Sequence, residues 1–90
     1  MFAEWNDRAI IVTKSANNEL LRDKLTMEDV VEILEKGFDC PRSKRAKDTV
    51  ERCLNRSYGT IKVVVVESVQ EWSKEKVWIL THVKLYKGGL

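Results

Sequence analysis

The chain has 90 residues, 43% of them hydrophobic and 33% charged, a length that allows one domain spanning residues 1–90 and excludes a second. Sixteen Lys and Arg against fourteen Asp and Glu leave a net charge of +2, so any basic site must be local. No run approaches about 18 consecutive apolar residues, which excludes a membrane-spanning helix. The N-terminus has no basic stretch followed by an apolar one, so we expect no signal peptide and a cytoplasmic location.

The two cysteines, Cys40 and Cys53, lack the CxxC spacing of a metal site and are too few for a secreted disulfide scaffold. We expect them to be reduced, with a facultative bridge as the less favoured alternative. The sequence also has no phosphate-binding glycine loop, no nucleophile elbow and no set of metal ligands. We therefore expect neither a cofactor nor a metal.

The N-terminal half predicts one strand followed by two short helices. The β-branched apolar run within residues 8–13 favours a strand. Residues 15–24 are expected to form a helix with Ser15 as its N-cap. A second helix begins at Thr26, which forms a capping box with Asp29, and ends at Gly37.

Residues 38–47 are predicted to be a loop and contain four cations, Arg42, Lys44, Arg45 and Lys47. Such a cluster is most often solvated, but it can also hold phosphate. Residues 48–56 fit either a helical stripe or one side of a strand, and we favour the strand because turn-forming residues follow it.

Residues 61–69 and 76–86 predict two long strands joined by the polar segment 70–75. In the second strand, simple alternation assigns one side to the core and the other to a mixed surface. The expected core side holds Val77, Ile79, Thr81, Val83 and Leu85. The expected surface side holds Trp78, Leu80, His82, Lys84 and Tyr86.

These elements predict an α+β domain: an N-terminal strand and two short helices packed on a three-stranded antiparallel meander. The stretches 13–16, 25–37, 61–66 and 79–83 resemble a family of small prokaryotic domains related to the RelE and BrnT type toxins. That resemblance implies a RelE-like fold, cleavage of messenger RNA and a small antitoxin-like partner. The family commonly has His, Ala and Arg at the positions of Ser15, Ala16 and Glu19, so this chain departs from the pattern at two of them.

Metal-independent RNA cleavage requires proton-transfer groups and cations that stabilise the charged phosphorane. On the alternation above, the candidate catalytic residues are His82, Arg52 and Lys84. Arg56 and the four cations of residues 42–47 are candidate RNA ligands, and Trp78 and Tyr86 could stack on bases. The alternative for a single histidine is a structural or solvated imidazole, and for the two aromatic residues it is packing.

Two other functions fit the same residues. A non-catalytic interaction module, binding a protein partner or a second copy of the chain, is favoured by the outward placement expected for Trp78 and Leu80. An RNA-binding module without catalysis is the other alternative, and it requires an affinity that falls steeply with salt.

Overall fold

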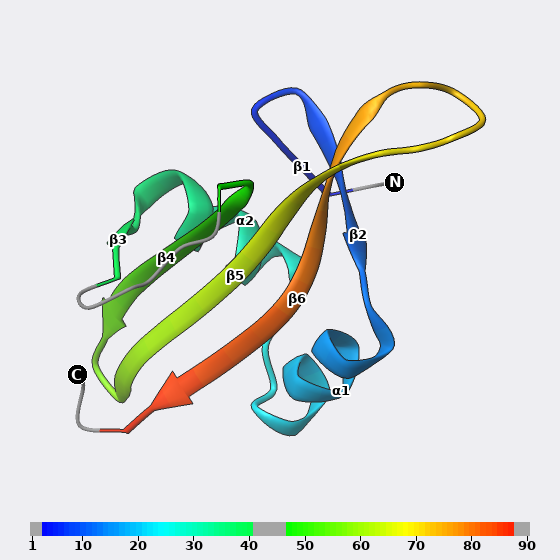
Figure 1. Cartoon of the computed structure of the whole chain (residues 1–90). Coiled ribbons are helices and arrows are strands. Elements are labelled where there is room, and N and C mark those ends of the chain that lie inside the picture. The colour runs from blue at the N-terminus through cyan, green and yellow to red at the C-terminus, as the bar shows by residue number, and fades with distance from the viewer. Residues whose placement is uncertain (1–2, 41–46, 88–90) are drawn as a thin grey trace.

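A computed structural model of the chain describes residues 3–40 and 47–87, and shows two helices and six strands (Figure 1). The helices are α1 (Lys14–Arg22) and α2 (Met27–Lys36). The strands are β1 (Glu4–Trp5), β2 (Arg8–Val12), β3 (Phe38–Asp39), β4 (Thr49–Arg56), β5 (Gly59–Val69) and β6 (Lys76–Tyr86). The α+β class is confirmed, and the segment at 48–56 is a strand.

The six strands form one mixed sheet in the order β1-β2-β6-β5-β4-β3. Strand β2 pairs in parallel with β6, and the other neighbouring strands pair antiparallel. The sheet is therefore larger than the predicted three-stranded meander. Short segments that sequence patterns could not distinguish from loops, Glu4–Trp5 and Phe38–Asp39, extend it at both edges.

Both helices begin at a threonine that caps their first turn. Thr13, rather than the predicted Ser15, is the N-cap of α1, because its Oγ1 accepts a hydrogen bond from the Ala16 N–H. The same Oγ1 donates to the carbonyl of Leu80, which fixes the start of α1 on β6. The predicted capping box of Thr26 and Asp29 at the start of α2 is confirmed.

Gly37 ends α2 where the chain passes close to β4. A side chain at this position would collide with the backbone oxygens of Ile33 and Cys53. Only glycine therefore lets the end of α2 approach β4 this closely.

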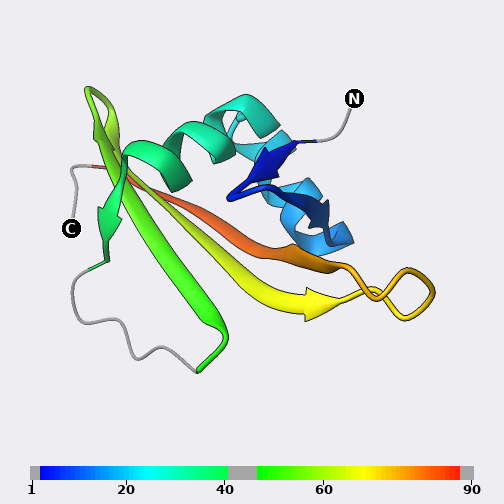
Figure 2. The ribbon, with the colours of Figure 1, turned by 90° about the horizontal axis from the view of Figure 1, so that it is seen from above.

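The helices cover one face of the sheet, and the sheet curls around α2 (Figure 2). Helix α1 runs beside β6, past the point where β2 ends (Figure 1). The core lies between the helices and this covered face, and its fully buried side chains include Ile33, Leu34, Ile61, Val63 and Leu80. The opposite side of β4, β5 and β6 carries no helix, and we call it the open face.

A β-bulge at Thr81 divides β6 into two parts with opposite alternation. Leu80 pairs with Val65 and His82 pairs with Val64, so Thr81 is an extra residue on β6. Before the bulge, Leu80 and Trp78 face the helices, whereas after it Val83 does. An extra residue reverses which side chains face the core. The prediction that assigned residues 76–86 to two faces by one unbroken alternation was therefore wrong.

Candidate functional site

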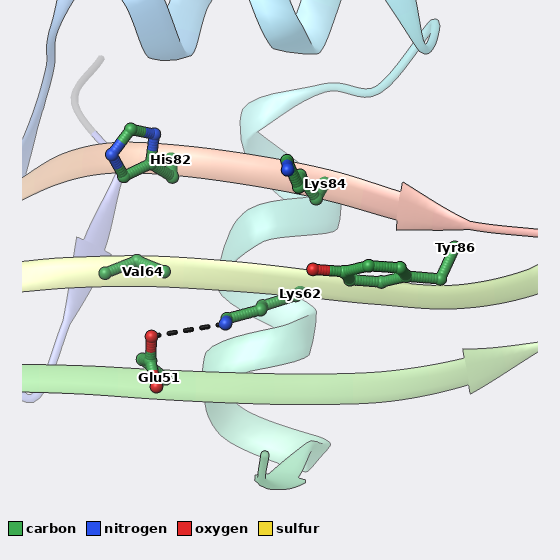
Figure 3. Close-up of a pocket in the computed structure, with 6 residues that line it drawn as sticks. All are labelled: Glu51, Lys62, Val64, His82, Lys84 and Tyr86. Carbon is green, nitrogen blue, oxygen red and sulfur yellow. Dashed lines mark ion pairs between the residues drawn. The ribbon is translucent and has the colours of Figure 1, made fainter. Parts of the chain in front are cut away.

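The open face contains a shallow hollow of about 270 Å³ between β4, β5 and β6 (Figure 3). The strand register places its residues in rows: Val64 is opposite His82, Lys62 is opposite Lys84, and Tyr86 follows on β6. Glu51 on β4 lies opposite Val64. We call the hollow lined by Glu51, Lys62, Val64, His82, Lys84 and Tyr86 the open-face hollow.

Two lysines face each other directly across β5 and β6 in this hollow. Lys62 forms an ion pair with Glu51, with 3.3 Å between Nζ and Oε1, and both side chains are mostly buried. Lys84 is exposed and makes no ion pair with any described residue. Like charges directly opposite one another on paired strands are unfavourable. Glu51 pairs with Lys62 alone, and an anion would relieve the remaining repulsion between the two ammonium groups.

His82 lies at the other side of the hollow, beside α1. Its side chain is 66% exposed, and its Nδ1 lies 3.5 Å from Oε1 of Glu19. That oxygen is buried and makes no hydrogen bond, so its ion-pair contact is with His82. With Nδ1 turned toward α1, Nε2 is the nitrogen left to meet a ligand.

Glu19 also occupies one of the positions at which the sequence departs from the RelE-like pattern. Its carboxylate lies against the imidazole of His82. The sequence did not indicate that Glu19 meets His82, because this contact depends on how α1 packs beside β6.

Arg52 and Arg56 lie on the covered face and point away from the open-face hollow. Arg52 donates through Nη2 to the carbonyl of Gly37 at 2.5 Å and through Nη1 to Asp39 at 3.4 Å. Arg56 donates to Glu32 of α2 at 2.7 Å. The structure therefore does not bring Arg52 together with His82 and Lys84, and both arginines hold α2 and β3 against β4.

Trp78 is a core residue, which corrects its expected place on the surface. It is 6% exposed, and its Nε1 donates to the carbonyl of Trp5 at 3.1 Å. The two indole rings lie 5.0 Å apart, and the Arg8 guanidinium lies 5.4 Å from the Trp78 ring. Leu80 is fully buried as well. Of the two aromatic residues predicted to stack on bases, only Tyr86 lies on the open face.

The predicted basic loop is only partly described. Arg42, Lys44 and Arg45 lie outside the described residues, and Lys47 is exposed in a turn. Phe38 and Asp39, expected in the loop, form β3.

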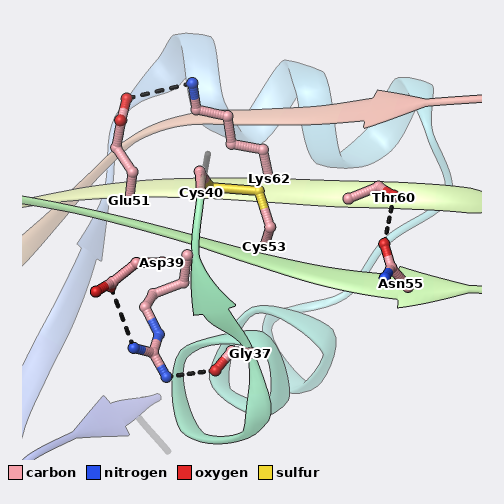
Figure 4. The surroundings of a disulfide bond; sticks show 9 residues. Gly37, Asp39, Cys40, Glu51, Cys53, Asn55, Thr60 and Lys62 are labelled. Carbon is pink, nitrogen blue, oxygen red and sulfur yellow. Dashed lines mark hydrogen bonds and ion pairs between the residues drawn. A yellow bond between two sulfur atoms is a disulfide. The ribbon is translucent and has the colours of Figure 1, made fainter. Parts of the chain in front are cut away.

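Cys40 and Cys53 form a disulfide, contrary to the expected reduced state (Figure 4). Their Cα atoms are 5.3 Å apart, because Cys53 lies on β4 and Cys40 directly follows β3. Cys53 is the strand partner of Lys62. The bridge therefore ties β3 to β4 next to the open-face hollow, a proximity that linear spacing did not indicate.

Sequence reasoning missed Glu51 and Lys62 as site residues. Lys62 had a usable signal, since it is a charged residue at the start of an otherwise apolar strand. Glu51 is next to Arg52 in the sequence, but neighbouring residues of a strand point to opposite faces, and the ion-pair partner of Glu51 is Lys62.

Within residues 3–40 and 47–87, no three His, Cys, Asp or Glu side chains lie close enough to hold a metal ion together. Neither of the described helices is long and apolar enough to cross a membrane. Comparison of the chain with protein-family models, curated proteins and solved structures found no match in any of the three.

Proposed function

We propose that this chain binds single-stranded RNA through the open-face hollow. The observation that carries the proposal is the direct opposition of Lys62 and Lys84, with only Glu51 to compensate them. A phosphate group placed between the two ammonium groups would replace repulsion with attraction. His82 adds a donor at one side of the hollow.

The shape and composition of the open face favour a single strand over a duplex. Tyr86 lines the hollow and offers a ring on which a base can stack. A small hollow on an open sheet accommodates a phosphate and its neighbouring base only if that base is unstacked. In a duplex the base stays stacked inside the helix. The resemblance to RelE-type toxins supports RNA as the substrate class. It also supports a cytoplasmic location and an antitoxin-like protein as a second partner.

Fluorescence anisotropy with labelled single-stranded RNA at several salt concentrations tests RNA binding. Two cationic contacts, from Lys62 and Lys84, would give a slope of about −1.4 in log affinity against log salt, from about −0.7 per phosphate contact. Lys84→Ala should weaken binding and make this slope shallower by about 0.7.

The matched control is Lys36→Gln, which removes one positive charge from the exposed last turn of α2. It should leave both affinity and slope near the wild-type values. Equal weakening by Lys84→Ala and Lys36→Gln would mean that RNA senses only net charge, and the open-face hollow would be rejected as the site.

The contact between His82 and Glu19 favours a second function at the same site, metal-independent RNA cleavage. Nε2 of His82 would accept the proton of a ribose 2′-hydroxyl, and O2′ would form a bond to phosphorus as the bond to O5′ breaks. The O5′ leaving group takes up a proton from solvent, which yields a 2′,3′-cyclic phosphate and a 5′-hydroxyl. Lys84 would stabilise the phosphorane.

Cleavage is tested with end-labelled RNA in EDTA, by detecting the cyclic phosphate end. His82→Ala should lower the rate by about 100-fold or more, the usual contribution of a general base. Arg52→Met, on the covered face, should leave the cleavage rate of the folded protein unchanged. RNA that is bound but never cleaved would leave the chain a binding module and exclude His82 as a catalytic residue.

A further inference from the structure

The polar segment that joins β5 to β6 carries the most exposed large apolar side chain among those described. We call residues 70–75 the hairpin tip. Trp72 lies in this tip and is 84% exposed. A tryptophan left in water at the end of a hairpin is costly for a monomer, and tryptophan is strongly enriched at the centres of protein interfaces. Trp78 and Leu80 were expected to provide an interaction surface, but Trp72 is the residue that the structure exposes.

The hairpin tip is held in shape by its own hydrogen bonds. The Gln70 N–H donates to the Glu75 carbonyl at 2.9 Å, and the Lys74 N–H donates to the Gln70 carbonyl at 2.8 Å. The Ser73 hydroxyl accepts from the Glu75 N–H at 3.3 Å. Trp72 is therefore presented by an ordered turn, which lowers the entropic cost of docking it.

The end of the molecule that carries Trp72 is acidic. The side chains of Glu71 and Glu75 make no ion pair with any described residue. The turn between β1 and β2 lies beside the tip, since Glu4 and Asp7 line a cleft together with Gln70 and Glu75. The cations of the same cleft, Arg8 and Lys76, are both paired with Glu67. Lys74 is the one cation within residues 70–75. A partner for this end must offer an apolar or aromatic recess bordered by cations.

The open-face hollow offers such apolar and cationic groups. It has Val64 on its floor, Tyr86 beside it, and Lys62 and Lys84 at its border. Glu51 and His82 complete its lining, and Glu51 compensates only Lys62. A lysine ammonium can lie over an indole face, and the tip carboxylates can pair with the lysines. Lys62, Lys84 and Tyr86 lie in the half of the β5–β6 hairpin that is farther from the tip, so a chain cannot fill its own hollow.

We propose that the hairpin tip of one copy of this chain docks into the open-face hollow of a second copy, with Trp72 as the central side chain. The contact is heterologous, because different surfaces of the two copies meet, so each pair of copies leaves one tip and one hollow free for further copies. If the open-face hollow also binds RNA, which is the proposed function above, self-association and RNA compete for it.

Sedimentation velocity over a range of protein concentrations tests the docking with two single variants. Trp72→Ser removes the anchor, and Lys84→Glu reverses the charge at the border of the hollow. Both side chains are exposed, so both variants should fold. The wild-type sedimentation coefficient should rise with concentration, and each variant alone should lose this rise.

Mixing the two variants is the decisive measurement. The Trp72→Ser chain keeps an intact hollow and the Lys84→Glu chain keeps an intact tip, so the mixture can form one productive contact. It should yield a 1:1 dimer and no larger species. A wild-type chain that stays monomeric, a Lys84→Glu chain that still associates, or a mixture without dimer would each overturn the proposal.

RNA binding separates this proposal from the preceding one. Trp72→Ser leaves the hollow intact and should bind RNA at least as tightly as the wild type. A chain that associates as described but binds no RNA would support the docking and reject the RNA site. If RNA dissociates the wild-type assembly, RNA and self-association compete for the hollow. RNA that binds without disturbing the assembly would overturn this competition.

Discussion

The two faces of the β4–β6 sheet use their charged side chains in different ways. On the covered face, Arg8, Arg52 and Arg56 each donate to a carboxylate or carbonyl within the fold. On the open face, Lys84 has no ion-pair partner among the described residues, and His82 is largely exposed. These cations on the covered face therefore stabilise the structure, whereas Lys84 on the open face remains available to a ligand, although its neighbour Lys62 is paired with Glu51.

The largest difference between the faces should appear when neighbouring apolar residues of β6 are truncated. Leu80 is fully buried beneath the helices, so Leu80→Ala should lower the free energy of unfolding by about 3 to 4 kcal/mol through lost burial and a cavity. Ile79 is half-buried on the open face, and Ile79→Ala should cost about 1 kcal/mol. Urea unfolding measures both. Equal losses of stability in the two variants would contradict the bulge at Thr81, which places Leu80 and not Ile79 beneath the helices.

Reduction of the disulfide between Cys40 and Cys53 should have the next largest effect. The bridge closes a loop of 13 residues, and its loss should destabilise the fold by about 2 to 3 kcal/mol. Urea midpoints with and without dithiothreitol measure this change. The double variant Cys40→Ala with Cys53→Ala should not respond to the reductant, and a wild type that is equally insensitive would show that the bridge does not form.

Removing a cation from each face should separate stability from binding. Arg56→Met breaks the ion pairs with Glu32 and Asp29, which are partly exposed, so it should cost about 1 kcal/mol. RNA affinity of the folded variant should not change. Lys84→Ala should behave in the opposite way, with an unchanged urea midpoint and weaker RNA binding. A loss of RNA affinity in Arg56→Met would contradict the assignment of stability to the covered face and of RNA binding to the open face.

The smallest expected effect is the pH dependence of stability that comes from the ion pair of Arg8 with Glu67 on the covered face. The hydrogen bond from Arg8, at 2.6 Å, lowers the pKa of Glu67 from its ordinary value of 4.5, and the charges of Arg8 and Lys76 act in the same direction. The folded state thus binds this proton less readily than the unfolded state. The resulting stabilisation is present above pH 4.5 and is lost as the pH falls through the lowered pKa.

Urea midpoints measured from about pH 6 down to pH 3 test this dependence. Glu67→Gln should lose stability less steeply than the wild type below pH 4.5. Glu71→Gln, in the hairpin tip, is the control and should follow the wild type. Parallel curves for Glu67→Gln and the wild type would show that the ion pair with Arg8 does not contribute.

The sequence by itself determined most of the elements, because their signals are local. The capping box at Thr26, the end of α2 at Gly37 and the long apolar strands all follow from residues within a few positions of one another. His82 and Lys84 were also identified correctly as open-face residues, since both follow the bulge and keep a common alternation.

Only the tertiary structure decided which side chains share a face and which groups meet. The extra residue at Thr81 reverses the alternation for Trp78 and Leu80, and it is visible only in the pairing of β5 with β6. The contact of Glu19 with His82 and the bridge of Cys40 with Cys53 join residues that are 63 and 13 positions apart. Such proximity depends on packing and strand register, which local composition does not encode.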